Sequence, residues 1–272
     1  MNSKGKTVRY VRFKHGEAVS YGICEGETIR EIQGSMFSNS TPTGRSFSFS
    51  EIELLVPCEP TKVLAVGLNY FSHREHVESS EGVLLNVTGR PPSRENPVVF
   101  AKFPTCLIPD GQDIVLPEGA TNVHFEGELV LVVGKKAKNV SIEEAHDHVF
   151  GVTIGNDLVD RNWLLDDLQW FRAKGSDNFG PIGPAIVSGL DYGCLNLETR
   201  VNGELRQSSN TRELVFSPDH ILSYCSRYVT LLPGDVIFTG TPGKTQRVQP
   251  GDTIEVAIED IGVLRNRVSA AR

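Results

Sequence analysis

The chain has 272 residues, of which 39% are hydrophobic and 22% are charged, and its formal net charge is −7. This composition is that of an ordinary soluble globular protein, long enough for one large domain with a small appendage. The negative charge argues against nucleic acid or an anionic membrane as the main partner, because both bind clustered Lys and Arg side chains. No apolar signal segment follows Met1, and no run approaches the ~18 apolar residues of a membrane span, so we expect a cytoplasmic protein.

The first 60 residues predict a small β region. Residues 7–24 have the pattern of a hairpin, two alternating strands joined by a turn. The polar tract over residues 35–50, rich in Ser, Thr and Gly, is typical of a loop and marks a boundary. We therefore divide the chain into an N-terminal β region, residues 1–60, and a main domain, residues 61–272.

The main domain opens with a buried strand over residues 61–67, which leads into a helix-prone stretch. His73 and His76 lie three residues apart there, so they can share one helix face. Taken alone, such a pair is typical of a solvated helix face. The long irregular segment of residues 77–96 predicts a lid beside a site or a disordered excursion, and we favour the lid because His73 lies at its start.

Residues 124–134 predict a buried strand with two acidic side chains near its start. Side chains alternate along a strand, so Glu126 and Glu128 point the same way, with Cα atoms roughly 6–7 Å apart. Carboxylates this close repel each other unless a proton or a cation lies between them. The pattern therefore predicts a divalent-metal site.

A third oxygen ligand is expected from residues 149–157, an apolar strand that ends in Gly-Asn-Asp. Asp157 lies at the end of that strand. Between the two strands, Ser141 and Glu144 form a capping box, which predicts a short helix. A strand, a short helix and a second strand can bring Asp157 near the two glutamates.

The rest of the chain predicts mainly packing elements and turns. Residues 158–171 have helical spacing, and Asn202-Gly203 is typical of a type I′ hairpin turn. Ser217 and Pro218 start a further helix as its N-cap and first helical residue. A buried strand then ends at Thr239-Gly240-Thr241-Pro242, where glycine lets backbone N–H groups and the Thr241 hydroxyl approach a bound carboxylate.

Five motifs follow one another along the chain: Gly67-Leu68-Asn69-Tyr70 with His73; Glu126-Gly127-Glu128; Asn156-Asp157 with Arg161; Lys174-Gly175-Ser176-Asp177 before Gly180-Pro181-Ile182-Gly183-Pro184; and Thr239-Gly240-Thr241-Pro242-Gly243. In order and approximate spacing they resemble the motifs of the fumarylacetoacetate hydrolase family, in its small acylpyruvate hydrolase or 2-hydroxyhepta-2,4-diene-1,7-dioate isomerase form. The resemblance covers about residues 61–268. It implies an α+β fold dominated by a mixed, rolled β-sandwich or barrel-like sheet with short helices.

The resemblance also implies roles for individual side chains. His73 matches the family's catalytic histidine, and Lys174 matches a lysine that stabilises an enolate. Thr241 completes the catalytic set that the motifs imply. The implied substrate-binding residues are Tyr70, Lys102, Arg161 and Gly240, and the implied ligands for Mg²⁺ or Mn²⁺ are Glu126, Glu128 and Asp157.

One position departs from the family pattern. The hydrolases carry a glutamate three residues after the catalytic histidine, and that carboxylate makes the imidazole a better base. Here the position is His76. Either Glu75, which we include among the catalytic residues, or Glu78 takes over the role, or the activation of water is impaired. Asn162 also replaces a usual aspartate beside Arg161.

We therefore expect a Mg²⁺- or Mn²⁺-dependent hydrolase of aromatic catabolism, which cleaves a C–C bond in a small 2,4-dioxo acid such as an acylpyruvate or fumarylpyruvate through a stabilised enolate. The alternative is a 2-oxo acid decarboxylase, or a keto–enol or double-bond isomerase, with the same metal site, and His76 favours it. A metal-bound binding protein without turnover and a purely structural β-domain are further alternatives. The expected partner is a small-molecule 2-oxo acid, and the resemblance implies a homodimer.

Overall fold

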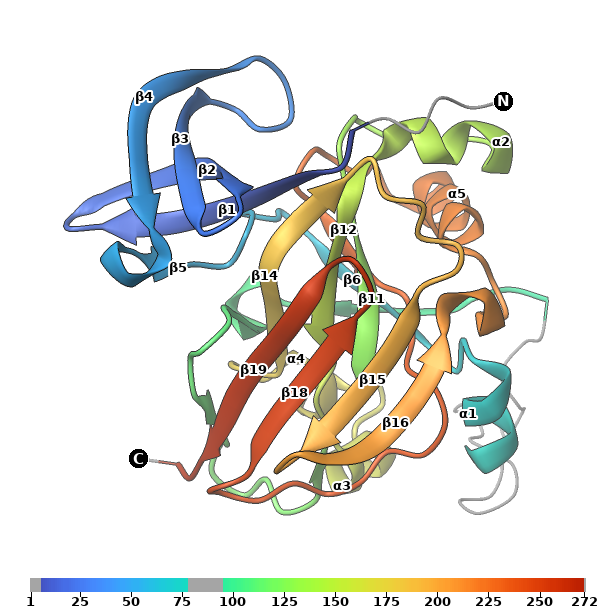
Figure 1. The fold of residues 1–272 in the computed structure, drawn as a ribbon. Coiled ribbons are helices and arrows are strands. Elements are labelled where there is room, and N and C mark those ends of the chain that lie inside the picture. The colour runs from blue at the N-terminus through green and yellow to red at the C-terminus, as the bar shows by residue number, and fades with distance from the viewer. Residues whose placement is uncertain (1–5, 78–94, 272) are drawn as a thin grey trace.

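The structure, a computed structural model, describes residues 6–77 and 95–271. Its described part consists mainly of strands, which form two large sheets and one short two-stranded sheet (Figure 1). The helices in this part are short and lie around the sheets: α1 (Phe71–His76), α2 (Ile142–Ala145), α3 (Arg161–Asp166), α4 (Phe171–Gly175) and α5 (Pro218–Tyr228). No helix among the described residues is long and apolar enough to cross a membrane.

The larger sheet has 12 strands: β1 (Val8–His15), β2 (Ala18–Glu25), β3 (Thr28–Gly34), β4 (Ser40–Ser48), β5 (Glu53–Leu54), β6 (Val63–Gly67), β7 (Val98–Lys102), β8 (Leu107–Ile108), β11 (Gly127–Val133), β12 (Val149–Asn156), β14 (Gly180–Ser188) and β17 (Val236–Phe238). Their order is β4-β3-β2-β1-β14-β12-β11-β17-β6-β7, and β5 pairs with β1 while β8 pairs with β14. The sheet is mixed, because β17 pairs with β6 and β8 with β14 in parallel, whereas its other pairs are antiparallel. The path begins and ends at different strands, so the described sheet is open, and the predicted barrel-like closure stays a prediction.

The second sheet packs in front of the central strands of the first (Figure 1). Its strand order is β16-β15-β18-β19-β9. A further short pair joins β10 to β13. The bounds of these strands are β9 (Ile114–Val115), β10 (Val123–His124), β13 (Val159–Asp160), β15 (Asn196–Val201), β16 (Glu204–Asn210), β18 (Thr253–Ile258) and β19 (Gly262–Ser269).

Strand β11 is buried on both faces, which explains the unbroken apolar run from Leu129 to Val133 that follows Glu128. Leu129 and Leu131 belong to the core between the two large sheets, together with Val256 of β18. Val130 faces the opposite way, into a second core that includes Ile32 of the N-terminal strands. Burial of each such side chain contributes roughly 1.5–3 kcal/mol, so β11 is a firmly held base for the residues at its start.

The N-terminal strands extend the larger sheet, because β1 pairs with β14 next to the central strands. The predicted hairpin is present as β1 and β2. The predicted loop over residues 35–50 is wrong in part, because Ser40–Ser48 forms strand β4 and pairs with β3. Its polar side chains are mostly exposed at the edge of the sheet, where a strand needs no apolar pattern.

Two further predictions of local structure have different outcomes. The capping box is present, since the Ser141 hydroxyl accepts the Glu144 N–H at the start of α2. The single helix over residues 158–171 is wrong, because the chain forms β13, then α3, and then turns before α4. Helix α3 ends at Asp166 because Asp167 is extended, with φ of −85° and ψ of 123°, and Trp170, whose φ of 57° lies in the left-handed region, precedes α4. Most of the predicted lid, residues 77–96, lies outside the described residues.

Candidate active site

Strands β11 and β12 bring three carboxylates together. The pair is antiparallel, and its register places Gly127 opposite Asn156, so the start of one strand lies beside the end of the other. The backbone N–H of Asp157 donates to the carbonyl of Glu126 over 2.9 Å. One oxygen from each of Glu126, Glu128 and Asp157 lies within 4.8 Å of the others, and all three side chains are buried. The three residues that the sequence predicts as metal ligands therefore meet in one place.

Two lysines neutralise two of these carboxylates. Lys174 of α4 places its Nζ 2.6 Å from Glu126 Oε2 and 2.7 Å from Asp157 Oδ2. Lys102 of β7 lies on the other side, with its Nζ 2.7 Å from Asp157 Oδ1. Lys102 also donates to the carbonyl of Phe179 over 3.0 Å. Both lysines are buried, so each is held at a fixed place beside the acidic cluster.

Glu128 has no lysine partner of this kind among the described residues. Its Oε2 accepts the backbone N–H of Gly240 over 2.7 Å. Burial, together with the charges of Asp157 and Glu126, raises the pKa of Glu128 well above its usual range. A buried carboxylate in this situation is stabilised by a proton or a cation, and three carboxylate oxygens are the hard ligands that Mg²⁺ and Mn²⁺ prefer. The residues present thus fit a divalent metal ion.

His73 lies close to this cluster on helix α1. Its side chain is buried, and its Nδ1 lies 2.6 Å from the carbonyl oxygen of Gly243. Burial lowers the pKa of His73, although the negative charge of Glu126 opposes the shift. Glu75 is exposed, whereas His73 is buried. Residues two positions apart on a helix face different sides, and the role of Glu75 stays a prediction.

Two of the predicted substrate-binding residues border the same region. Arg161 places its Nη2 4.0 Å from Glu126 Oε1 and 2.8 Å from the Thr245 hydroxyl. Tyr70 is fully buried, and its hydroxyl has no hydrogen-bond partner among the described residues. A buried hydroxyl without a partner costs free energy, so Tyr70 OH is a polar atom available to a ligand.

The segment after β17 lies across the start of β11. Gly240 has φ of 108°, and a Cβ there would lie 2.7 Å from the Cβ of Asn69, so glycine is required by both conformation and space. The Thr241 hydroxyl donates to the carbonyl of Gly127 over 3.0 Å and accepts from Gln207 Nε2 over 3.0 Å. In this structure the Thr241 hydroxyl is therefore engaged within the protein.

Gln207 and the Gly243 carbonyl belong to the site but are not among the residues predicted from the sequence. Gln207 belongs to β16 in the second sheet, and the alternation of that strand indicates only that the side chain faces inward. The Gly243 carbonyl is a backbone group, which residue type does not reveal. Inward-facing polar residues in a strand are the one signal that points to Gln207.

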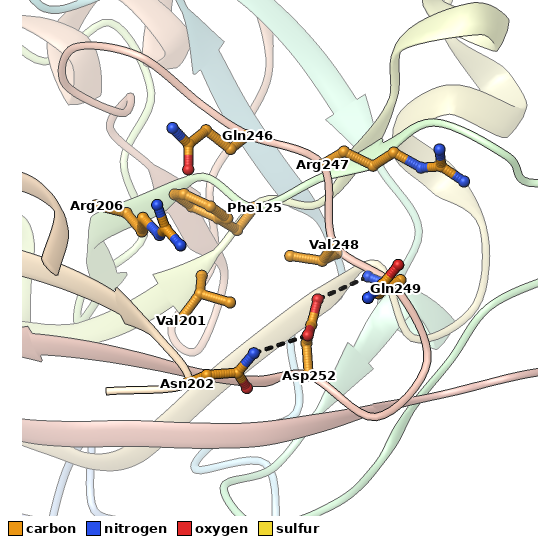
Figure 2. A pocket seen from close by; sticks show the side chains of 9 residues that line it. All are labelled: Phe125, Val201, Asn202, Arg206, Gln246, Arg247, Val248, Gln249 and Asp252. Carbon is orange, nitrogen blue, oxygen red and sulfur yellow. Dashed lines mark hydrogen bonds between the residues drawn. The ribbon is translucent and has the colours of Figure 1, made fainter. Parts of the chain in front are cut away.

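A separate cavity of about 340 Å³ lies nearby (Figure 2). None of the three clustered carboxylates lines it, although Phe125 does. Its wall also includes Arg206, next to Gln207 in the sequence, and Asp252, which accepts from Asn202 over 2.8 Å. The cavity is thus distinct from the carboxylate cluster. The residues that line it are Phe125, Val201, Asn202, Arg206, Gln246, Arg247, Val248, Gln249 and Asp252.

Comparison of the sequence with protein-family models gives two matches. The family described as "Fumarylacetoacetate (FAA) hydrolase C-terminal" matches residues 62–269. The family described as "Rv2993c-like, N-terminal" matches residues 8–57. The first match contains all the candidate site residues named above.

Curated relatives align with most of the chain. Protein Rv2993c of Mycobacterium tuberculosis is 39% identical over 271 residues, covering 96% of this chain and 98% of the relative. The human mitochondrial oxaloacetate tautomerase FAHD2B is 37% identical over 233 residues, covering 81% of this chain and 70% of the relative.

Solved structures share the fold. The 2-hydroxyhepta-2,4-diene-1,7-dioate isomerase from Mycobacterium marinum superposes with a TM-score of 0.86 at 37% identity, over 97% of this chain and 98% of that one. The maleylpyruvate hydrolase from Sphingobium sp. SYK-6, in complex with manganese(II) and pyruvate, superposes with a TM-score of 0.77 at 26% identity, over 97% of this chain and 100% of that one.

Proposed function

Because the chain belongs to the fumarylacetoacetate hydrolase family, we propose that it is a divalent-metal-dependent enzyme that interconverts the keto and enol forms of a small, oxaloacetate-like 2-oxo acid. The observation that carries the proposal is the contact between His73 Nδ1 and the Gly243 carbonyl. No carboxylate among the described residues hydrogen-bonds to this imidazole. An imidazole that is held by a backbone carbonyl suits proton transfer on carbon and oxygen better than activation of water, for which a carboxylate makes the imidazole a stronger base.

The charges around the cluster support an anionic substrate. Three carboxylates face the two ammonium groups of Lys102 and Lys174, and Arg161 adds a third positive charge at the border. A divalent ion, when bound, supplies electrostatic stabilisation for the negative charge that develops on substrate oxygens. With such an ion the region becomes positive in sum, which favours a substrate with two carboxylates. Arg161 is well suited to one of them, because a guanidinium can bind a carboxylate through two parallel hydrogen bonds.

His73 is the proposed proton carrier. Burial lowers its pKa, which keeps the imidazole neutral near pH 7 and able to accept a proton. In the enol-to-keto direction the enol hydroxyl loses one proton and C3 gains one. The composition of the acid does not change, so the reaction consumes neither water nor an oxidant.

A hydrolase remains the second candidate, because the maleylpyruvate hydrolase structure contains manganese and pyruvate in the same fold. In that case His73 would activate water for attack on a 2,4-dioxo acid, and Glu75 would serve as its expected partner. Whichever reaction applies, we propose Mg²⁺ or Mn²⁺ at Glu126, Glu128 and Asp157, a small 2-oxo acid as ligand, and a homodimer as the assembly.

The deciding experiment uses metal-stripped protein with and without Mg²⁺, on oxaloacetate and acetylpyruvate side by side. The enol form is followed by its ultraviolet absorbance, and pyruvate by a coupled reaction. We expect Mg²⁺-dependent loss of the oxaloacetate enol without release of pyruvate. Pyruvate from acetylpyruvate would instead support the hydrolase, and pyruvate from oxaloacetate would support a decarboxylase. No Mg²⁺-dependent change with either acid would contradict the proposal.

Matched variants make the result specific to the site. Glu126→Gln removes a proposed metal ligand and should abolish the Mg²⁺-dependent reaction. Glu143→Gln is the same substitution on the exposed surface of α2, and it should leave the reaction unchanged. His73→Ala should retain the binding of Mg²⁺ but lose turnover.

A further inference from the structure

The segment from Thr239 to Gly243 is anchored to β11 residue by residue. The Thr239 hydroxyl donates to the carbonyl of Leu129 over 2.8 Å, and the N–H of Gly240 donates to Glu128. Thr241 donates to the carbonyl of Gly127. The segment is therefore fixed relative to the carboxylate cluster up to Thr241.

Gln207 holds the next part of the segment from the second sheet. Its Nε2 donates to the Thr241 hydroxyl over 3.0 Å and to the Pro242 carbonyl over 2.7 Å, while its Oε1 accepts the N–H of Gly127 over 3.3 Å. The side chain is only 4% exposed. Both polar ends of this buried amide are thus used, and they join β11 to the segment.

Helix α1 holds the far end of the segment. The Gly243 N–H donates to the Ser72 hydroxyl over 3.0 Å, and the Gly243 carbonyl lies 2.6 Å from His73 Nδ1. A carbonyl oxygen only accepts hydrogen bonds, so Nδ1 must carry the proton in this contact. In a neutral imidazole the other nitrogen, Nε2, is then the unprotonated acceptor.

We infer that Gln207 and Ser72 are positioning residues, which hold the Gly243 carbonyl against His73 and so keep Nε2 as its proton-accepting nitrogen. The backbone carbonyl then fixes the orientation and tautomer of the ring, a task that a side-chain carboxylate performs in a histidine–carboxylate dyad. The inference rests on the proposed function in one respect, namely that His73 carries the proton. The tautomer itself follows from the contacts and does not depend on the substrate.

The test compares Ser72 variants in the full-length, Mg²⁺-loaded protein with histidines labelled by ¹⁵N. The ¹⁵N chemical shifts of the His73 ring report which nitrogen carries the proton. The His73 signals are assigned as those that are absent from the spectrum of His73→Ala. We expect the Nδ1–H tautomer in the wild type, a mixture of tautomers in Ser72→Ala, and restoration in Ser72→Thr, which retains the hydroxyl. Ser72 is exposed, so its substitution leaves the core intact. Ser208→Ala, an exposed serine beside Gln207, is the matched control and should resemble the wild type.

Kinetics provide the second measurement. In Ser72→Ala, kcat should fall roughly tenfold while KM changes less than about twofold, because only the orientation of the base is disturbed. Gln207→Leu should change the tautomer in the same direction. The inference would be overturned by an Nε2–H tautomer in the wild type. It would also be overturned if both Ser72→Ala and Gln207→Leu kept the tautomer of the wild type. Failure of the proposed function has a different signature, since the acids would not turn over while the tautomer responded as expected.

Discussion

Two buried glutamates of this protein, Glu31 and Glu128, lie in opposite environments. Their side chains are 3% and 1% exposed, respectively, so burial alone does not distinguish them. Glu31 in β3 accepts hydrogen bonds from Ser20 at 2.7 Å, from Thr43 at 2.6 Å and from two nitrogens of Arg45 at 2.5 and 2.6 Å. Burial opposes the ionised form, but these hydrogen bonds outweigh it and lower the pKa of Glu31.

Glu128 in β11 shows the reverse. Its described hydrogen bond is to Gly240, and its neighbours Asp157 and Glu126 carry charge of the same sign. Burial and this repulsion raise its pKa. A carboxylate whose hydrogen bonds are satisfied within the chain joins two pieces of structure, whereas one that is buried among other carboxylates is stabilised by a proton or a cation. We therefore predict a structural role for Glu31 and a metal-binding role for Glu128.

The largest expected effect comes from Glu128→Gln. Loss of a metal ligand should reduce Mg²⁺-dependent turnover of the oxaloacetate enol by at least about 100-fold and remove the Mg²⁺-induced rise in Tm. The metal-free variant should be no less stable than the metal-free wild type, because the amide, like the protonated carboxyl group that it replaces, carries no charge beside the neighbouring carboxylates. Turnover assays and thermal unfolding of both proteins check this. A variant that retained both turnover and the rise in Tm would exclude Glu128 as a ligand.

Glu31→Gln should lower the stability of the protein and leave its turnover unchanged, the opposite of Glu128→Gln. It weakens the hydrogen bonds from Arg45, Thr43 and Ser20, and we expect a loss of about 2 kcal/mol in the free energy of unfolding. The loss is limited because the Arg45 side chain is exposed to solvent. Turnover per folded molecule should stay at the wild-type level. Denaturant unfolding gives the first quantity, and enol assays on folded protein give the second. Equal turnover losses in Glu31→Gln and Glu128→Gln would remove the distinction between the two glutamates.

The pH dependence of metal binding gives a smaller effect. The folded-state pKa of Glu128 is raised well above its ordinary value, so between the two pKa values the metal-free folded protein holds a proton that the unfolded chain releases. Its contribution to stability therefore falls as pH rises from the unfolded value to the folded one. Binding of the metal displaces that proton, so Mg²⁺ affinity should rise by up to tenfold per pH unit within this window, or ~1.4 kcal/mol.

The Mg²⁺ affinity is measured by titrating Mg²⁺ into the metal-free protein at several pH values between about 5 and 8 and following Tm. The Glu31→Gln variant serves as control and should follow the wild type, because its substitution lies outside the cluster. Mg²⁺ affinity that did not change with pH would mean that Glu128 is already ionised without metal.

Much of the candidate site was predictable from local sequence. Glu126 and Glu128 are two positions apart in the sequence, although the strand predicted for both begins only at Gly127, and Asp157 follows a second apolar run. The hairpin turn was equally local, since Asn202 and Gly203 both have positive φ, as a type I′ turn requires. Each of these features is decided by residues that are close in the chain.

Contacts between distant segments were decided by the tertiary structure alone. The register that sets Gly127 opposite Asn156 brings Asp157 to the glutamates. Gln207 and the Gly243 carbonyl reach the site from elements that no local pattern connects to β11 or to His73. Long-range pairing also made a strand of the polar residues in β4, against their local preference. The sequence by itself determined which residue types stand at strand ends, and the tertiary structure decided which of them meet, because hydrogen-bonding partners far apart in the chain leave no periodic signal in it.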